Sequence, residues 1–249
     1  MTARPSLFLF AAVSLCGAGA AFADLSGRTE AGFVMARGNA ETETANVKLE
    51  LTKQLEKWKN TFGTSALYGR TSHATTAERW DVRWQTEYRF YDGFFWFGAL
   101  RYEDDRFSGF DYQGSASLGI GRAFIDTERT KLFAQIGAGY RRLRPEVLVR
   151  DEAGLVIDRI LGEPEGNAVG NGTLKFEHAL NDATRVLDSF IVESGADNTR
   201  MQNDLALEVK MTEVLALSLG LSVRRNSKPP EGMDKQDTLT TVNLVYRIE

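Results

Sequence analysis

One stretch of the chain, Ala77 to Phe90, alternates apolar and charged side chains with a strict period of two. This period predicts a β-strand, because successive side chains of a strand point to opposite faces. An ordinary strand has about five or six residues, whereas a tilted strand that crosses a bilayer needs about nine to eleven. The stretch therefore predicts a transmembrane strand. Its lipid-facing side carries Trp80, Val82, Trp84, Tyr88 and Phe90, and its lumen-facing side carries Arg79, Asp81, Arg83, Glu87 and Arg89.

The first residues predict a secretory signal peptide over residues 1–23. Arg4 supplies a positive start, Leu7 to Leu15 is a short apolar core, and Ala21-Phe22-Ala23 fits the small-x-small cleavage pattern. The single cysteine leaves with this segment, so the mature chain has no disulfide and no thiol nucleophile. We expect residues 24–249 to form one exported domain.

The composition limits the classes of protein and partner. The chain has 30 Lys and Arg against 34 Asp and Glu, which argues against a nucleic-acid partner. No run after the signal peptide is long enough for a membrane helix. If the mature chain lies in a membrane, a closed β-barrel is the remaining option. The reason is that lipid offers no hydrogen-bond partners, so every backbone group must pair within the protein.

Strand signals recur along the mature chain with turn residues between them, and they predict an all-β fold. We expect a transmembrane antiparallel up-and-down β-barrel of about twelve strands, an even number of the kind that closed bacterial barrels have. In the eleventh strand, Leu215, Leu217, Leu219 and Leu221 face lipid. The expected strands cover about 28–36, 44–54, 58–69, 77–90, 94–102, 112–123, 131–141, 168–178, 184–193, 201–211, 215–224 and 238–248.

The connections between these strands alternate in length, which predicts short periplasmic turns and longer outer loops. Every second connection is a short turn, such as Asp126-Thr127. The longest of the other connections, Leu143–Asn167, could hold a short hairpin of Val147–Val149 with Leu155–Ile157. The predicted long polar loops are Arg70–Thr76, Glu103–Gly109, Leu143–Asn167 and Asn226–Asp237.

The inward faces of the predicted strands differ in size across the lumen. Lys48 and Glu50 join the charged lumen side of residues 77–90, whereas the sixth and seventh strands present small side chains. Because unpaired buried charges are costly, we expect the long side chains to pair with one another as they extend toward the small wall. This arrangement predicts a largely filled lumen with at most a narrow wet path. The small residues are Ser115, Ser117, Gly119, Gly121, Gly137 and Gly139.

Several short blocks resemble the family of salt-induced outer membrane proteins (YdiY-like, domain of unknown function 481). The resemblance covers nearly the whole mature chain and includes the loop Asp104, Asp105, Arg106, Phe107, Ser108 and Gly109. It implies an outer membrane β-barrel, and it carries over no reaction and no catalytic residue. The blocks are Gly38-Asn39, Tyr102 with Asp105–Tyr112, Gly119-Ile120-Gly121, Lys228-Pro229-Pro230, Asp237-Thr238 and Asn243–Tyr246.

Enzymatic alternatives rest on few residues. His73, beside Ser72 in an expected outer loop, is the one plausibly placed base of a rim-located hydrolase, and a solvated loop histidine is the simpler interpretation. Glu103, Asp104 and Asp105 could bind a hard cation such as Ca²⁺, but a plain acidic loop at the rim is the favoured interpretation. We therefore predict no catalytic residue, no metal site and no cofactor.

The sequence as a whole predicts a non-enzymatic bacterial outer membrane barrel, either structural or a narrow pore. The resemblance implies a link to salt or osmotic stress. Outer membrane lipids and, during insertion, the barrel-assembly machinery are the expected partners. Two alternatives stay open: a rim-located hydrolase of the lipase or deacylase type, and a receptor or adhesin that uses the segment Leu143–Asn167.

Overall fold

The structure is a computed structural model that describes residues 25–36, 42–71, 74–106, 108–150, 156–196, 198–229 and 234–248. The predicted signal peptide lies outside these residues. Within them, no helix is long and apolar enough to cross a membrane. The strands are β1 (Leu25–Ala36), β2 (Thr42–Leu55), β3 (Trp58–Thr71), β4 (Ala74–Tyr91), β5 (Phe94–Asp105), β6 (Phe110–Asp126), β7 (Thr130–Arg150), β8 (Val156–Leu161), β9 (Glu165–Ala179), β10 (Thr184–Gly195), β11 (Thr199–Lys210), β12 (Leu215–Asn226) and β13 (Gln236–Ile248).

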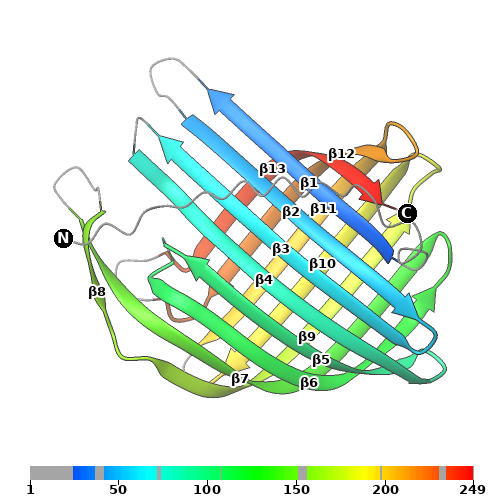
Figure 1. The fold of residues 1–249 in the computed structure, drawn as a ribbon, viewed down its shortest axis with the longest axis horizontal. Coiled ribbons are helices and arrows are strands. Elements are labelled where there is room, and N and C mark those ends of the chain that lie inside the picture. Colours follow the sequence, from blue (N-terminus) through cyan, green and yellow to red (C-terminus); the bar gives the residue numbers. More distant parts are fainter. Residues whose placement is uncertain are drawn as a thin grey trace.

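Twelve of these strands close into an antiparallel barrel, which confirms the predicted fold (Figure 1). Each strand pairs with its neighbours in sequence, β1 pairs with β13, and β7 pairs with both β6 and β9. The remaining strand, β8, stands outside this ring of twelve. Among the described residues it pairs with the last part of β7. Closure leaves the barrel itself without a free edge, so the backbone groups of the wall are paired between strands.

The two ends of the barrel differ. At one end, called here the short-turn end, the connections are 56–57, 92–93, 127–129, 180–183 and 211–214. Glu56 and Gly93 have positive φ angles of 27° and 69° in two of these turns. The other end, called here the hairpin end, carries the extension of β7 and the strand β8.

Three of the predicted long loops are wrong in extent. β3 runs to Thr71 and β4 begins at Ala74, so Arg70–Thr76 is mostly strand. β5 continues to Asp105 and takes in the acidic residues assigned to a loop. Polar side chains at a strand end show only that this part of the strand contacts water. The strand itself continues for as long as a neighbouring strand pairs with its backbone, so polar residues do not mark where it ends. The predicted turn Gly38-Asn39 lies outside the described residues.

The segment Leu143–Asn167, predicted as an irregular loop, forms a hairpin. β7 continues to Arg150 and pairs with β8, and Val147 lies opposite Ile160. The predicted hairpin is thus present, but its second strand is 156–161. Arg159 fixes the hairpin to the barrel: its Nη1 lies 2.6 Å from Glu146 Oε1, and its Nη2 donates to the Arg106 carbonyl oxygen at 3.1 Å.

The outer wall of the barrel is apolar. Trp80, Trp84 and Phe90 expose 43%, 42% and 43% of their surface on the outside of β4. On β12, Leu217, Leu219 and Leu221 are exposed on the same outer wall. A water-soluble chain does not leave so continuous an apolar surface uncovered, whereas a lipid-embedded barrel requires it.

Aromatic rings form a girdle near each end of this wall. Trp80 and Phe90, one in each girdle, are ten residues apart on β4, about 33 Å along a strand or about 25 Å along the axis of a tilted one. That span matches the apolar band of an outer-membrane-type barrel, about 25 Å tall. Ring centroids near the short-turn end lie 4.9 Å apart for Trp58–Tyr88 and 5.6 Å for Phe90–Trp96, and near the hairpin end 5.3 Å for Trp80–Tyr102 and 6.2 Å for Tyr102–Tyr112.

Candidate functional site in the lumen

The inward charges of β2 and β4 lie along the lumen as separate pairs. Arg83 Nη2 lies 3.5 Å from Glu50 Oε2, and both side chains are nearly half exposed, at 46% and 43%. Glu87 pairs with Lys59 at 3.6 Å. Side chains that are so exposed and so loosely paired line an open part of the lumen and do not fill it.

The remaining predicted lumen charges differ in their surroundings. Asp81 is buried and accepts a hydrogen bond from Ser65 Oγ. Arg79 lies 3.9 Å from Asp105 of the neighbouring strand. Lys48 lies within electrostatic range of Glu30. Arg89 is exposed at the short-turn end.

At Gly119 and Gly121, the small wall of β6 and β7 is covered by rings of its neighbour β5, and not by the charges of β2 and β4 that the sequence predicts there. Phe97 lies opposite Gly119 in the register, and Phe95 lies opposite Gly121. Both rings are buried, and a Cβ on Gly119 would lie 2.6 Å from the Phe97 ring. A cross-strand neighbour reaches this space before any side chain from the far wall does.

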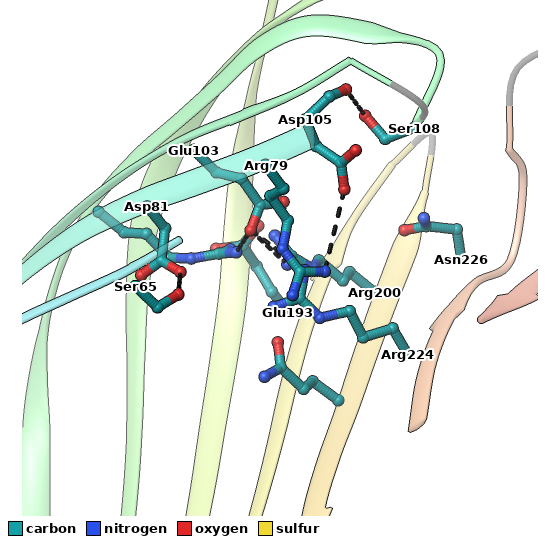
Figure 2. A network of polar contacts seen from close by, with 12 residues as sticks. Ser65, Arg79, Asp81, Glu103, Asp105, Ser108, Glu193, Arg200, Arg224 and Asn226 are labelled. Atoms are coloured by element: carbon teal, nitrogen blue, oxygen red, sulfur yellow. Dashed lines mark hydrogen bonds and ion pairs between the residues drawn. The ribbon is translucent and has the colours of Figure 1, made fainter. Parts of the chain in front are cut away.

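The lumen is bridged near the hairpin end by what we call the bridge cluster: Glu103 and the three arginines Arg101, Arg200 and Arg224. Figure 2 shows Glu103, Arg200 and Arg224 of this cluster. Glu103 Oε2 lies 2.5 Å from Arg101, 3.2 Å from Arg200 and 3.3 Å from Arg224. Its side chain is only 3% exposed. One buried carboxylate therefore pairs with three guanidinium groups, in the kind of network that buried charges require.

The bridge cluster crosses the full width of the barrel. Glu103 lies on β5 and Arg224 on β12, and in the ring these strands are six positions apart in either direction. Arg200 comes from β11, the next strand of the far wall. Two opposite walls therefore meet through side chains at this level of the lumen.

A second cluster near the short-turn end has the same composition. Glu208 of β11 is fully buried, and its carboxylate contacts three arginines. Two of them have a further acid: Arg28 lies 2.9 Å from Glu30, and Arg185 lies 2.8 Å from Glu177. We call this group the base cluster: Glu208, Arg28, Arg185 and Arg247. It fills the side of the lumen formed by β10–β13 and β1.

The opposite side of the short-turn end is open. A cavity of about 480 Å³, called here the vestibule, lies between β2 and β7. Phe95 and Phe133 are apolar surfaces in it, and Lys59 lies over the Phe133 ring at 6.0 Å. Its charged lining residues are Lys57, Lys59, Glu87, Arg89, Asp92, Asp126 and Lys131.

Residues of both clusters were missing from the predicted lumen set. The sequence predicts a loop at Glu103, and it does not single out Arg200, Arg224 or Glu208 as site residues. The alternation on β5 does predict the inward direction of two of these residues. Arg101 and Glu103 stand at the same alternate positions as the inward-facing Phe95 and Phe97. Parity gives the face of a side chain, but it does not give its height in the barrel or its partner across the lumen.

The described residues of the motif loop, and His178, make local contacts. Ser108 Oγ donates to the Asp105 carbonyl oxygen at 2.8 Å, and Arg106 pairs with Glu78 at 2.9 Å. His178 Nδ1 lies 2.8 Å from Thr130 Oγ1. Phe107 and His73 lie outside the described residues. Among those described, no three acidic or histidine side chains are grouped to hold a metal ion.

Comparisons with known proteins agree with this fold. The family model described as "Protein of unknown function, DUF481" matches residues 29–248. The uncharacterized protein YdiY of Escherichia coli K12 is 23% identical over 226 residues, which cover 88% of this chain and 82% of that protein.

Two solved structures are similar to this chain. An outer membrane channel from Pseudomonas putida F1 superposes with a TM-score of 0.50 at 9% identity and covers 90% of this chain and 95% of its own. The NanC porin gives a TM-score of 0.45 at 11% identity, with coverage of 90% and 97%. At such identities the likeness is one of fold.

Proposed function

The chain belongs to the family of proteins of unknown function DUF481, and from this premise we propose that it is a non-enzymatic outer membrane barrel forming a narrow, normally closed pore. Its short-turn end faces the periplasm, as short turns do in bacterial barrels of this kind. Outer membrane lipids contact its apolar wall, and the barrel-assembly machinery inserts it. The physiological setting implied by the resemblance, salt or osmotic stress, is tested by growth of a deletion strain at high salt.

The bridge cluster is the observation that carries this proposal. Glu103 and Arg224 come from opposite walls and lie 3.3 Å apart, so the lumen is blocked by side chains and not by a folded domain. Barrels of about eight strands are filled with side chains, and barrels of sixteen or more hold wide channels. A twelve-stranded barrel that is crossed by side chains at the bridge cluster lies between these two cases.

The vestibule supports the same function from the other end. Its 480 Å³ are large enough for water and are lined by charges of both signs and by Phe95. A purely structural barrel gains nothing from an open, charged vestibule below a single closed layer. A pore requires both features.

Planar-bilayer recording of the refolded protein tests the proposal. We expect the wild-type protein to show a small or absent steady conductance, and Glu103→Ala to raise it several-fold. Without the carboxylate, the three guanidinium groups that surround it repel one another and separate. The current through the variant should be carried mainly by anions.

The matched control is the double variant Glu50→Ala with Arg83→Ala. This pair lies in the wet part of the lumen, and its removal should leave the conductance of the closed protein unchanged. A wild-type conductance as large as that of a general porin would contradict the proposal. So would a folded Glu103→Ala protein that conducts no better than the wild type.

A further inference from the structure

A small hollow lies beside the bridge cluster at the hairpin end of the lumen. It is lined by three guanidinium groups, one carboxylate, one amide and one hydroxyl group. A water-sized sphere does not fit between them while Glu103 holds Arg101 and Arg200. The lining side chains are Arg101, Arg141, Arg200, Gln113, Ser115 and Glu193.

Arg141 in this hollow is buried, and one of its donor groups, Nε, has no acceptor among the described residues. Its side chain is 3% exposed; Nη1 donates to Glu193 at 3.2 Å and Nη2 to the Asn198 carbonyl oxygen at 3.2 Å. Its Nε is buried with no hydrogen-bond partner among the described residues, and the same holds for Nε of Arg224. Buried donors without acceptors are rare in folded proteins and indicate a group that the chain itself does not supply.

The nearby acids are already engaged and do not supply it. Asp204 accepts hydrogen bonds from Gln202 at 2.6 Å and from Ser222 at 2.5 Å. Asp81 accepts one from Ser65. Glu193, the one carboxylate that lines the hollow, accepts from Arg141, and Glu103 is shared by three arginines. Three guanidinium groups therefore line the hollow against a single carboxylate, so donors exceed acceptors.

From this excess we infer that the hollow is a binding site for a small oxyanion, a carboxylate or a phosphate, held by Arg101, Arg141 and Arg200. The planar fork of a guanidinium group matches both kinds of anion. The carboxylate of Glu103 occupies the place of such an anion in the closed pore. An incoming oxyanion competes with Glu103 for Arg101 and Arg200 and thereby loosens the bridge.

The inference rests on the proposed pore, because the anion reaches the hollow through the lumen. The base cluster provides an internal contrast. It also gathers three arginines about a glutamate, but Arg28 and Arg185 each have a second acid within 2.9 Å. We therefore assign no anion site to the base cluster.

Isothermal titration calorimetry on the refolded protein in a non-ionic detergent tests the site, with inorganic phosphate and acetate as separate probes. We expect saturable binding of at least one probe, and the preferred probe identifies the class of anion. Arg141→Gln should weaken binding at least tenfold, and Arg185→Gln, the matched change in the base cluster, should leave it unchanged. If Arg141→Gln does not fold, Arg141→Lys keeps the charge without the fork and should also weaken binding.

The outcomes separate this inference from the pore itself. No saturable binding of either probe, or equal binding by a folded Arg141 variant, would overturn the oxyanion site even if Glu103→Ala conducts. Binding that Arg141→Gln abolishes, with no conductance in any variant, would support the site and overturn the pore. Binding lost equally in Arg141→Gln and Arg185→Gln would show a general charge effect and would also count against the site.

Discussion

Glu103 and Glu208 hold the two most heavily paired positions of the lumen. The side chain of each glutamate is at most 3% exposed, and each contacts three arginines. Arg101 lies two residues from Glu103 in the sequence, and the other five arginines come from distant parts of the chain. Moving so many charges out of water is costly, and close pairing offsets that cost only while all partners remain. Loss of the shared carboxylate is therefore worse than loss of any one arginine.

Glu208→Ala is expected to lower the free energy of unfolding by about 3–5 kcal/mol, because three guanidinium groups would remain together without their acid. Equilibrium unfolding in urea, with the protein in lipid vesicles, measures this. Glu213→Ala is the control. Glu213 also pairs with a cation, Lys210, but it is 89% exposed, so its loss should cost no more than about 1 kcal/mol.

The faces of single residues could be derived from the sequence, but their partners could not. The alternation placed Arg83 and Trp84 on opposite faces, and in the structure Arg83 pairs with Glu50 while Trp84 is exposed on the outer wall. Glu103 meets Arg224 across 121 residues of sequence. That contact depends on how the strands are staggered around the closed ring, which no local pattern records.

At the scale of the strands, the packing of β5 against β6 and β7 explains the glycines of the small wall. Gly119 lies opposite both Phe97 and Gly137, so it has a ring on one side and a backbone on the other. A Cβ there would lie 2.6 Å from Gly137 Cα and 2.6 Å from the Phe97 ring. The glycine therefore allows two strands and an inward ring to approach closely.

Gly119→Ala should destabilise the barrel by about 1–3 kcal/mol, because the added methyl group must displace a ring or a strand. Gly170→Ala on β9 is the matched control. A Cβ at Gly170 meets no atom within 4 Å, so this change should be neutral or slightly stabilising. Unfolding of both variants in vesicles gives the comparison, and equal effects would show that the close approach at Gly119 has no energetic weight.

The existence and order of the strands were predictable because membrane strands are long and their alternation is strict. Their ends were not. β7 has 21 residues and leaves the barrel wall to pair with β8, although its last part looks like a polar loop in the sequence. Inside the wall, burial enforces the period of two. Beyond it, both faces meet water, so the pattern weakens while the hydrogen-bonded ladder continues.

At the scale of the whole molecule, the barrel contains two environments separated by one layer of backbone. Arg83 and Trp84 are neighbours on β4 and have similar exposed fractions, 46% for the Arg83 side chain and 42% for Trp84. Exposure alone therefore does not distinguish them. What distinguishes them is the medium: Arg83 faces the lumen, whereas Trp84 lies on the apolar outer wall between the two aromatic girdles.

Cysteine labelling in native membranes separates these environments, since the predicted mature chain has no thiol of its own. We expect Arg83→Cys to react with a small water-soluble maleimide and to spare a lipophilic one, and Trp84→Cys to show the opposite preference. The reason is that a charge at the midplane of the outer wall would cost about 2–4 kcal/mol for arginine, which confines Arg83 to the water-filled side. If a lipophilic probe reacts at position 83 and spares position 84, the assignment of both walls is inverted and the proposed pore is lost with it.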